Sequence, residues 1–167
     1  MTGEAKIIWR RWPATGGPAV ESPEPPVAAF DYRRLSAMAD HMLKTRRERL
    51  PGDIAQNRVD EVEAKREIAA FEYLAANWRF IATGESEPAG FGADHILRDA
   101  LDASITTAAA FAGEAGGFSE TLGAMTESAI ALRWHLEPGR QTIALARLTH
   151  QLRAAARAAN SSKEPAK

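Results

Sequence analysis

The most regular pattern of hydrophobic and polar positions in the chain runs from Ala64 to Thr83. Wound at about 100° per residue, this stretch and the residues just before it place their apolar side chains on two stripes, on roughly opposite sides of a helix. The wider stripe holds Ile68, Phe71, Leu74, Ala75, Trp78 and Ile81, and the other holds Val62, Ala69, Tyr73, Ala76 and Phe80. Because a surface helix needs only one apolar face, the pattern predicts a long central helix with neighbours on both sides.

Four other segments carry apolar residues at helical spacing, at about residues 31–50, 94–112, 119–137 and 140–159. Pro51-Gly52 marks the end of the first of them, and Asp53 is the predicted cap of the central helix, which ends at Gly84. Only two or three residues then join the first two helices, which predicts an antiparallel hairpin. Two of the later segments have a clear inward face. In the segment 94–112 the residues expected inside are Leu97, Leu101, Ile105, Ala108 and Phe111, and in the segment 140–159 they are Leu145, Leu148, Leu152 and Ala155.

The two ends of the chain differ from the middle. Residues 1–30 are rich in Pro and Gly, which forbids a long helix and predicts an extended arm with one short strand at Ile7–Trp12. Residues 160–167 form a polar tail. The sequence therefore predicts an all-α, single-domain bundle of about five helices over residues 31–159, with an N-terminal arm.

Composition narrows the class of protein. The chain has 167 residues, a net charge of −1 and no Cys, so disulfides, thiolate catalysis and cysteine-rich metal sites are excluded. The N-terminus lacks the continuous apolar core of a signal peptide, and no apolar run approaches the roughly 18–20 residues of a membrane helix. We expect a cytoplasmic protein that has no membrane contact.

No motif for catalysis or for a metal is present. The four histidines, His41, His95, His135 and His150, are not preceded by Glu or Asp at the spacing of a di-iron helix bundle. They form no i,i+4 pair for zinc either, and no serine stands in a nucleophile elbow. His135, close to a helix C-terminus, is expected to be a cation that the helix dipole stabilises. The sequence thus favours a protein without a cofactor and without enzymatic activity.

Charge is distributed unevenly along the chain. The predicted helices at 31–50 and 140–159 carry net charges of +3 and +4, whereas residues 53–88 and 93–137 carry −4 and −5. Two interpretations follow. Either the basic helices lie against the acidic ones, which we favour, or their arginines form an exposed patch for nucleic acid or an acidic protein. The residues of such a patch would be Arg46, Arg47, Arg49, Arg147, Arg153 and Arg157.

The run Trp9-Arg10-Arg11-Trp12 is a second candidate contact site. Trp and Arg are enriched at the hot spots of protein interfaces. The arm would then dock onto a partner or onto a second copy of the chain. The alternative is that it folds back over its own bundle.

Three hypotheses for function follow. The first is a non-enzymatic α-helical protein-interaction or regulatory protein that self-associates as a homodimer through the arm and a basic helical face. The second is a nucleic-acid-binding accessory protein that uses the two basic helices. The third is a bundle that holds a small apolar ligand between the second, third and fourth helices. Its cavity would be lined by Trp78, Phe80, Phe111 and Trp134.

Overall fold

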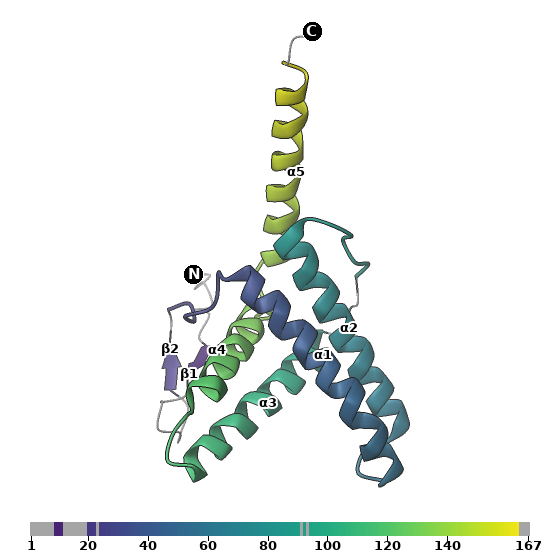
Figure 1. Cartoon of the computed structure of the whole chain (residues 1–167), viewed down its shortest axis with the longest axis vertical. Helices are drawn as coiled ribbons and strands as arrows, with labels where there is room; N and C mark the ends of the chain where they lie inside the picture. Colours follow the sequence, from purple (N-terminus) through teal and green to yellow (C-terminus); the bar gives the residue numbers. More distant parts are fainter. Residues whose placement is uncertain (1–8, 12–19, 23, 91, 93, 164–167) are drawn as a thin grey trace, which may run out of the picture.

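The computed structural model describes residues 9–11, 20–22, 24–90, 92 and 94–163. This part of the chain contains five helices, which confirms the predicted all-α bundle (Figure 1). The helices are α1 (Tyr32–Ala55), α2 (Glu61–Thr83), α3 (Asp94–Glu114), α4 (Glu120–His135) and α5 (Thr142–Ser161). Two short strands, β1 (Trp9–Arg11) and β2 (Val20–Ser22), precede them.

The boundary predicted between the first two helices is wrong. α1 continues through Pro51 to Ala55, and Asp60 caps α2 by accepting hydrogen bonds from the amides of the first turn, at 3.0 and 3.3 Å. Asp53 instead holds the last turn of α1, because it forms ion pairs with Arg49 at 3.2 Å and Arg58 at 2.7 Å. These contacts offset the one backbone hydrogen bond that a proline removes from a helix interior.

The central position predicted for α2 is confirmed. It packs against α1, α3 and α5, and Phe71, Leu74 and Trp78 on its wider stripe are all buried. The second stripe is covered only in part, since Phe80 is buried but Val62 is exposed. The main core joins this wider stripe to the inner faces of α1, α3 and α4.

α3 and α4 form a second antiparallel hairpin. Ser119 caps α4 as predicted, accepting a hydrogen bond from the amide of Leu122 at 3.1 Å. In α3 the inward face ends on Ala109 and Ala112, so the expectation for Phe111 is wrong: its side chain is exposed. The two hairpins meet near the start of α5 and diverge toward their tips, which Figure 1 shows as two arms opening downward.

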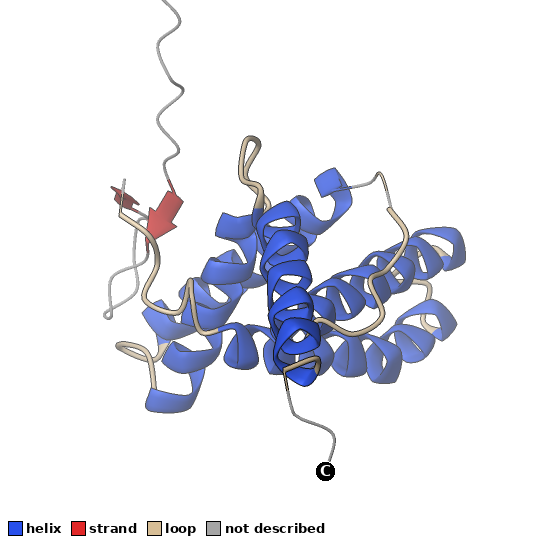
Figure 2. Cartoon of the chain, turned by 90° about the horizontal axis from the view of Figure 1, so that it is seen from above, coloured by secondary structure: helices blue, strands red, loops and turns tan. Residues whose placement is uncertain are grey.

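α5 leaves the bundle and projects from it (Figure 1). Seen from above, it stands over the middle of the molecule, with the tips of the two hairpins on either side (Figure 2). None of its residues is buried. The expectation that Leu145, Leu148 and Leu152 lie in the core is therefore wrong.

The segment before α1 is partly tied to the bundle. β1 pairs with β2 in an antiparallel register that sets Arg10 opposite Glu21, and β1 also contacts α4. Ala28 and Ala29, within the predicted arm, are buried. Trp12 lies outside the described residues.

Candidate functional site

The base of α5 is attached to the bundle by one of its faces. His150 donates a hydrogen bond from Nε2 to the carbonyl of Ile81, with 3.1 Å between the two atoms, and its ring lies edge-on to Phe80, with centroids 5.5 Å apart. Gly84, the C-cap of α2, has φ of 79°, and a Cβ there would lie 2.7 Å from Nδ1 of His150. A glycine is thus required both by the left-handed backbone and by the close approach of α5.

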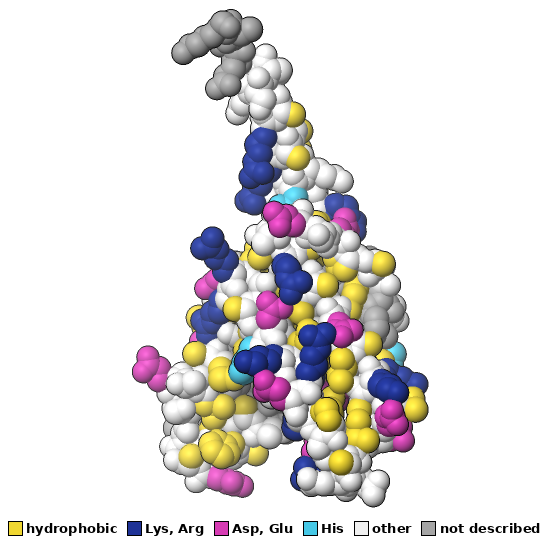
Figure 3. Space-filling view, turned by 45° about the vertical axis from the view of Figure 1, so that its right-hand side comes forward, with side chains coloured by type: hydrophobic (Ala, Val, Ile, Leu, Met, Phe, Trp, Pro, Cys, Tyr) yellow, Lys and Arg dark blue, Asp and Glu magenta, His cyan; other side chains and the backbone are white. Residues whose placement is uncertain are grey.

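The opposite face of α5 is exposed in the described part of the chain. Leu145, Leu148 and Leu152 are 60%, 53% and 62% exposed. We call these three side chains the leucine face. Figure 3 shows the projecting helix with basic side chains along one side and hydrophobic ones on the other. Isolated exposed leucines are ordinary, but a row of three on one projecting helix is typical of an interaction site.

The arginines predicted to form one basic patch lie in different environments. Arg47 pairs with Glu72 of α2 at 2.6 Å, and Arg49 pairs with Asp53 within α1. Arg147 donates to Glu87 at 2.7 Å from its Nε. Arg153 and Arg157 lie on the exposed part of α5. The basic helix α1 therefore packs against the acidic helix α2, the arrangement that the sequence favoured.

Arg46 lies in the interior. Its Nε donates to Glu67 at 2.7 Å, Nη1 to the carbonyl of Met42 at 3.3 Å, and Nη2 to Ser104 Oγ at 3.1 Å. The guanidinium stacks over the ring of Phe71, 3.6 Å from its centroid. Burial lowers the pKa of Arg46, and the hydrogen bond and charge of Glu67 oppose that shift. This arginine joins α1, α2 and α3.

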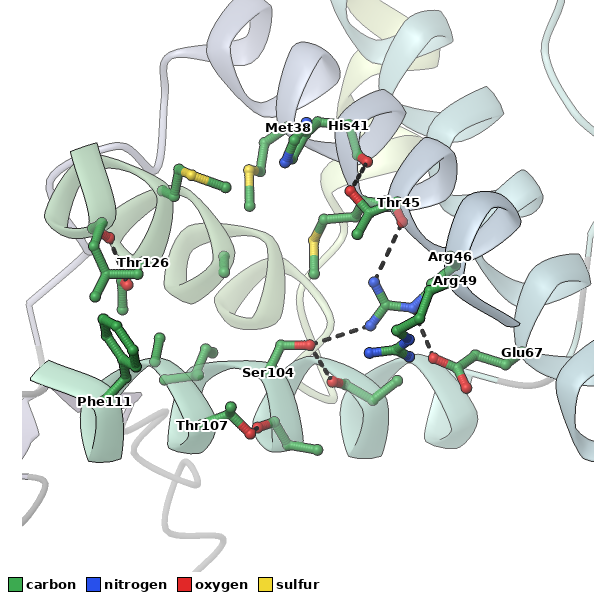
Figure 4. Close-up of a pocket in the computed structure, with 18 residues that line it drawn as sticks. Met38, His41, Thr45, Arg46, Arg49, Glu67, Ser104, Thr107, Phe111 and Thr126 are labelled. Atoms are coloured by element: carbon green, nitrogen blue, oxygen red, sulfur yellow. Dashed lines mark hydrogen bonds and ion pairs between the residues drawn. The ribbon is translucent and has the colours of Figure 1, made fainter. Parts of the chain in front are cut away.

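A groove of about 670 Å³ lies between the diverging hairpins (Figure 4). Its walls come mainly from α1, α3 and α4, with one residue of α2, and Met38, Met42 and Met125 line it. Arg46, Arg49 and Glu67 form its polar end, while Phe111 and Thr126 lie at the other end. Of the four aromatic residues predicted to line a cavity, only Phe111 lines this groove, since Trp78, Phe80 and Trp134 are used in helix packing.

A group of aromatic rings around His135 closes the opposite end of the bundle. The His135 ring lies 4.8 Å from both Trp78 and Trp134 and 6.3 Å from Tyr32, measured between ring centroids. Its Nε2 donates to the carbonyl of Ala29 at 2.6 Å, so Nδ1 of the neutral ring accepts from the hydroxyl of Thr142, at 2.7 Å. One imidazole thus ties the segment before α1 and the start of α5 to the end of α4.

The expectation that His135 is a helix-end cation is wrong. Burial lowers its pKa to about 4 from the usual 6.5, and the nearby charge of Arg140 adds to the effect, although the hydrogen bond to Ala29 opposes it. Desolvation therefore outweighs the favourable field of the helix C-terminus.

The free energy of unfolding should accordingly decrease as the pH falls from about 6.5 toward 4. Because the folded-state pKa of His135 is below its unfolded value, the unfolded state binds the extra proton. The contribution of His135 to the free energy of unfolding is fully present above its unfolded-state pKa. It is lost as the pH falls toward its folded-state pKa. The expected loss is about 2 kcal/mol between pH 7 and pH 5, measured by urea unfolding at each pH.

His135→Gln should remove most of this pH dependence, while His41→Gln, at an exposed position, should retain it. A wild-type stability that stays constant from pH 7 to pH 5 would contradict a neutral, buried His135.

Two features of the site were not recognised from the sequence, although each leaves a signal there. The leucines of α5 recur with spacings of three and four, which gives a narrow stripe of the kind found between two paired helices. Three of the four methionines of the chain fall on α1 and α4, and methionine is frequent at adaptable binding surfaces.

Several classes of site find no support among the described residues. They contain no group of three or more His, Asp or Glu side chains able to hold a metal ion. None of the described helices is long and apolar enough to cross a membrane. Comparison with protein-family models, with curated proteins and with solved structures finds no match to this chain.

Proposed function

We propose that this chain is a non-enzymatic protein-interaction or regulatory protein that self-associates. The observation that carries the proposal is the leucine face of α5: a helix with three leucines more than half exposed projects from an otherwise well-packed bundle.

The energetics of a helix support this assignment of α5 to binding. Most helices in proteins are stabilised mainly by packing of their apolar face and less by intrinsic helix propensity. α5 has no side-chain cap at its N-terminus, and its leucine face has no neighbour among the described residues. A partner that covers this face would supply the missing packing.

Self-association should be concentration-dependent and should require the leucine face. We expect sedimentation velocity to show a monomer–dimer equilibrium for the full chain. Leu148→Gln combined with Leu152→Gln should raise the dimer dissociation constant at least about a hundredfold, because each buried leucine contributes about 1.5–3 kcal/mol. A chain that remains monomeric at all accessible concentrations would contradict self-association.

The matched control is Ala154→Gln. It adds the same side chain at an exposed position on the other side of α5, so it should leave both the dissociation constant and the helical circular dichroism unchanged. An equal loss of association in this variant would mean that the substitutions act on α5 folding rather than on the interface.

The groove favours a second candidate, the binding of a small apolar ligand. Its volume and its methionine-rich lining are typical of ligand pockets. Displacement of an apolar fluorescent dye, with Ala108→Trp as the variant that fills the groove, tests this candidate.

The nucleic-acid candidate has less support. Arg46, Arg47, Arg49 and Arg147 each have a carboxylate partner, and among the described residues only Arg153 and Arg157 of the predicted patch lack one. Two arginines without a carboxylate partner form only a small positive patch for binding a polyanion.

A further inference from the structure

The leucines of α5 and two of its alanines follow a heptad repeat over about two heptads. Counted from the first leucine of the face, the residues at alternating a and d positions are Leu145, Leu148, Leu152, Ala155 and Ala159. A strict a/d stripe is the narrow seam of two paired helices and not the wider stripe of a helix that covers a globular core. The spacing therefore indicates that the partner of α5 is a single helix.

The residues that flank this seam carry no charge. The e and g positions hold Ala144, Thr149, Gln151, Ala156 and Ala158. At 100° per residue, the three arginines of α5 lie about 120° or more from the middle of the seam. α5 contains no acidic residue that could pair with these arginines. Because the arginines lie away from the seam, two copies can still meet along it without bringing arginines together. The small flanking residues also let the two backbones approach closely.

The distribution of side-chain size along the seam selects one relative orientation. The three leucines of the seam lie at positions 145–152, and its two alanines follow at positions 155 and 159. An antiparallel pair sets the large side chains of one helix against the small ones of the other, so that both halves interdigitate. A parallel pair would set leucine against leucine at one end and leave only alanines at the other.

The helix dipoles favour the same orientation, because they oppose one another in an antiparallel pair. The arginines do not decide the orientation, since they lie away from the seam in either arrangement.

We infer that α5 pairs antiparallel with α5 of a second copy of this chain, through the leucine face and the alanines that continue it. The inference rests on the proposed self-association and specifies its interface. The projection of α5 leaves room for this arrangement, because its second half extends beyond the bundle and the two bundles would lie at opposite ends of the helix pair (Figure 1). The contact is isologous, so it closes at two copies and does not extend into a fibre.

The absence of cysteine from the chain makes disulfide mapping direct. We would introduce Leu148→Cys and Ala159→Cys in separate full-length chains, oxidise each alone and as a mixture, and analyse them by non-reducing electrophoresis. The antiparallel pair brings position 148 of one chain close to position 159 of the other. We therefore expect a covalent dimer in the mixture and little in either chain alone.

Ala154→Cys is the matched control, because its position faces away from the seam and should form no covalent dimer with itself or with either variant. Efficient cross-linking of Leu148→Cys and of Ala159→Cys each with itself would show a parallel pair and overturn the inference.

The two proposals fail in distinguishable ways. If sedimentation shows a dimer of the unmodified chain but no cysteine pair cross-links, the interface lies elsewhere: the inference is wrong and self-association stands. If the unmodified chain is monomeric at every concentration tested, both are wrong.

Discussion

Trp78→Ala should destabilise the protein by about 3–5 kcal/mol, the usual cost of truncating a buried tryptophan to alanine. The side chain is only 3% exposed and lies against Tyr32 and His135, with ring centroids 5.9 and 4.8 Å away. The substitution would leave a cavity where α1, α2 and α4 meet. A loss of this size is a large fraction of the stability of a typical domain, and a denaturant melt measures it.

The neighbouring variant Arg79→Ala is the control for this experiment. Arg79 pairs with Asp40 at 3.0 Å across an exposed surface, so its removal should change the free energy of unfolding by less than about 1 kcal/mol. If Trp78→Ala cost as little as this control, α2 would not be the central helix of the bundle.

Arg46→Ala should be the second most damaging change, with a loss of about 3 kcal/mol. Removing one partner of a buried ion pair leaves the other without compensation, and Glu67 would keep its charge at a side chain that is 27% exposed. The stacking over Phe71 and the hydrogen bonds to Met42 and Ser104 would be lost as well. Thermal and urea unfolding of the variant measure the loss.

Arg47→Ala is the matched comparison, one position along the same helix. Its ion pair with Glu72 joins two half-exposed side chains, for which a contribution of at most about 1 kcal/mol is expected. Equal effects of the two substitutions would contradict the structural role of Arg46 and would return it to the set of candidate contact residues.

The fold class could be predicted from the sequence because it depends on local signals that agree with each other. Apolar spacing located five helices, and Ser119 and Gly84 marked ends that the structure confirms. Pro51 misled the prediction of the first boundary, because a proline is a strong local signal for a helix end. The ion pairs of Asp53 with Arg49 and Arg58 are weaker local signals for the continuation of the helix.

The candidate site could not be predicted for a different reason. Hydrophobic spacing shows which face of a helix prefers to be buried, but not what buries it. This spacing predicts that the leucines of α5 lie in the core of their own chain, but they are exposed. Likewise, the sequence showed that α1 is basic and α2 acidic, but only the geometry separates the interior Arg46 from the half-exposed Arg47.

The order of the helices in space also has a consequence for the speed of folding. α1 packs mainly on α2, and α3 on α4, so most contacts join segments that are close in the sequence. Such topologies fold fast, because little loop-closure entropy is lost before contacts form. The contacts between distant segments include that of α1 with α4, where Arg34 donates to Ser128 Oγ at 2.8 Å and to the carbonyl of Ala124 at 2.7 Å, across some 90 residues of chain. The two hairpins are therefore expected to form early, and their docking through α1–α4 and α2–α3 contacts is expected to be the late step.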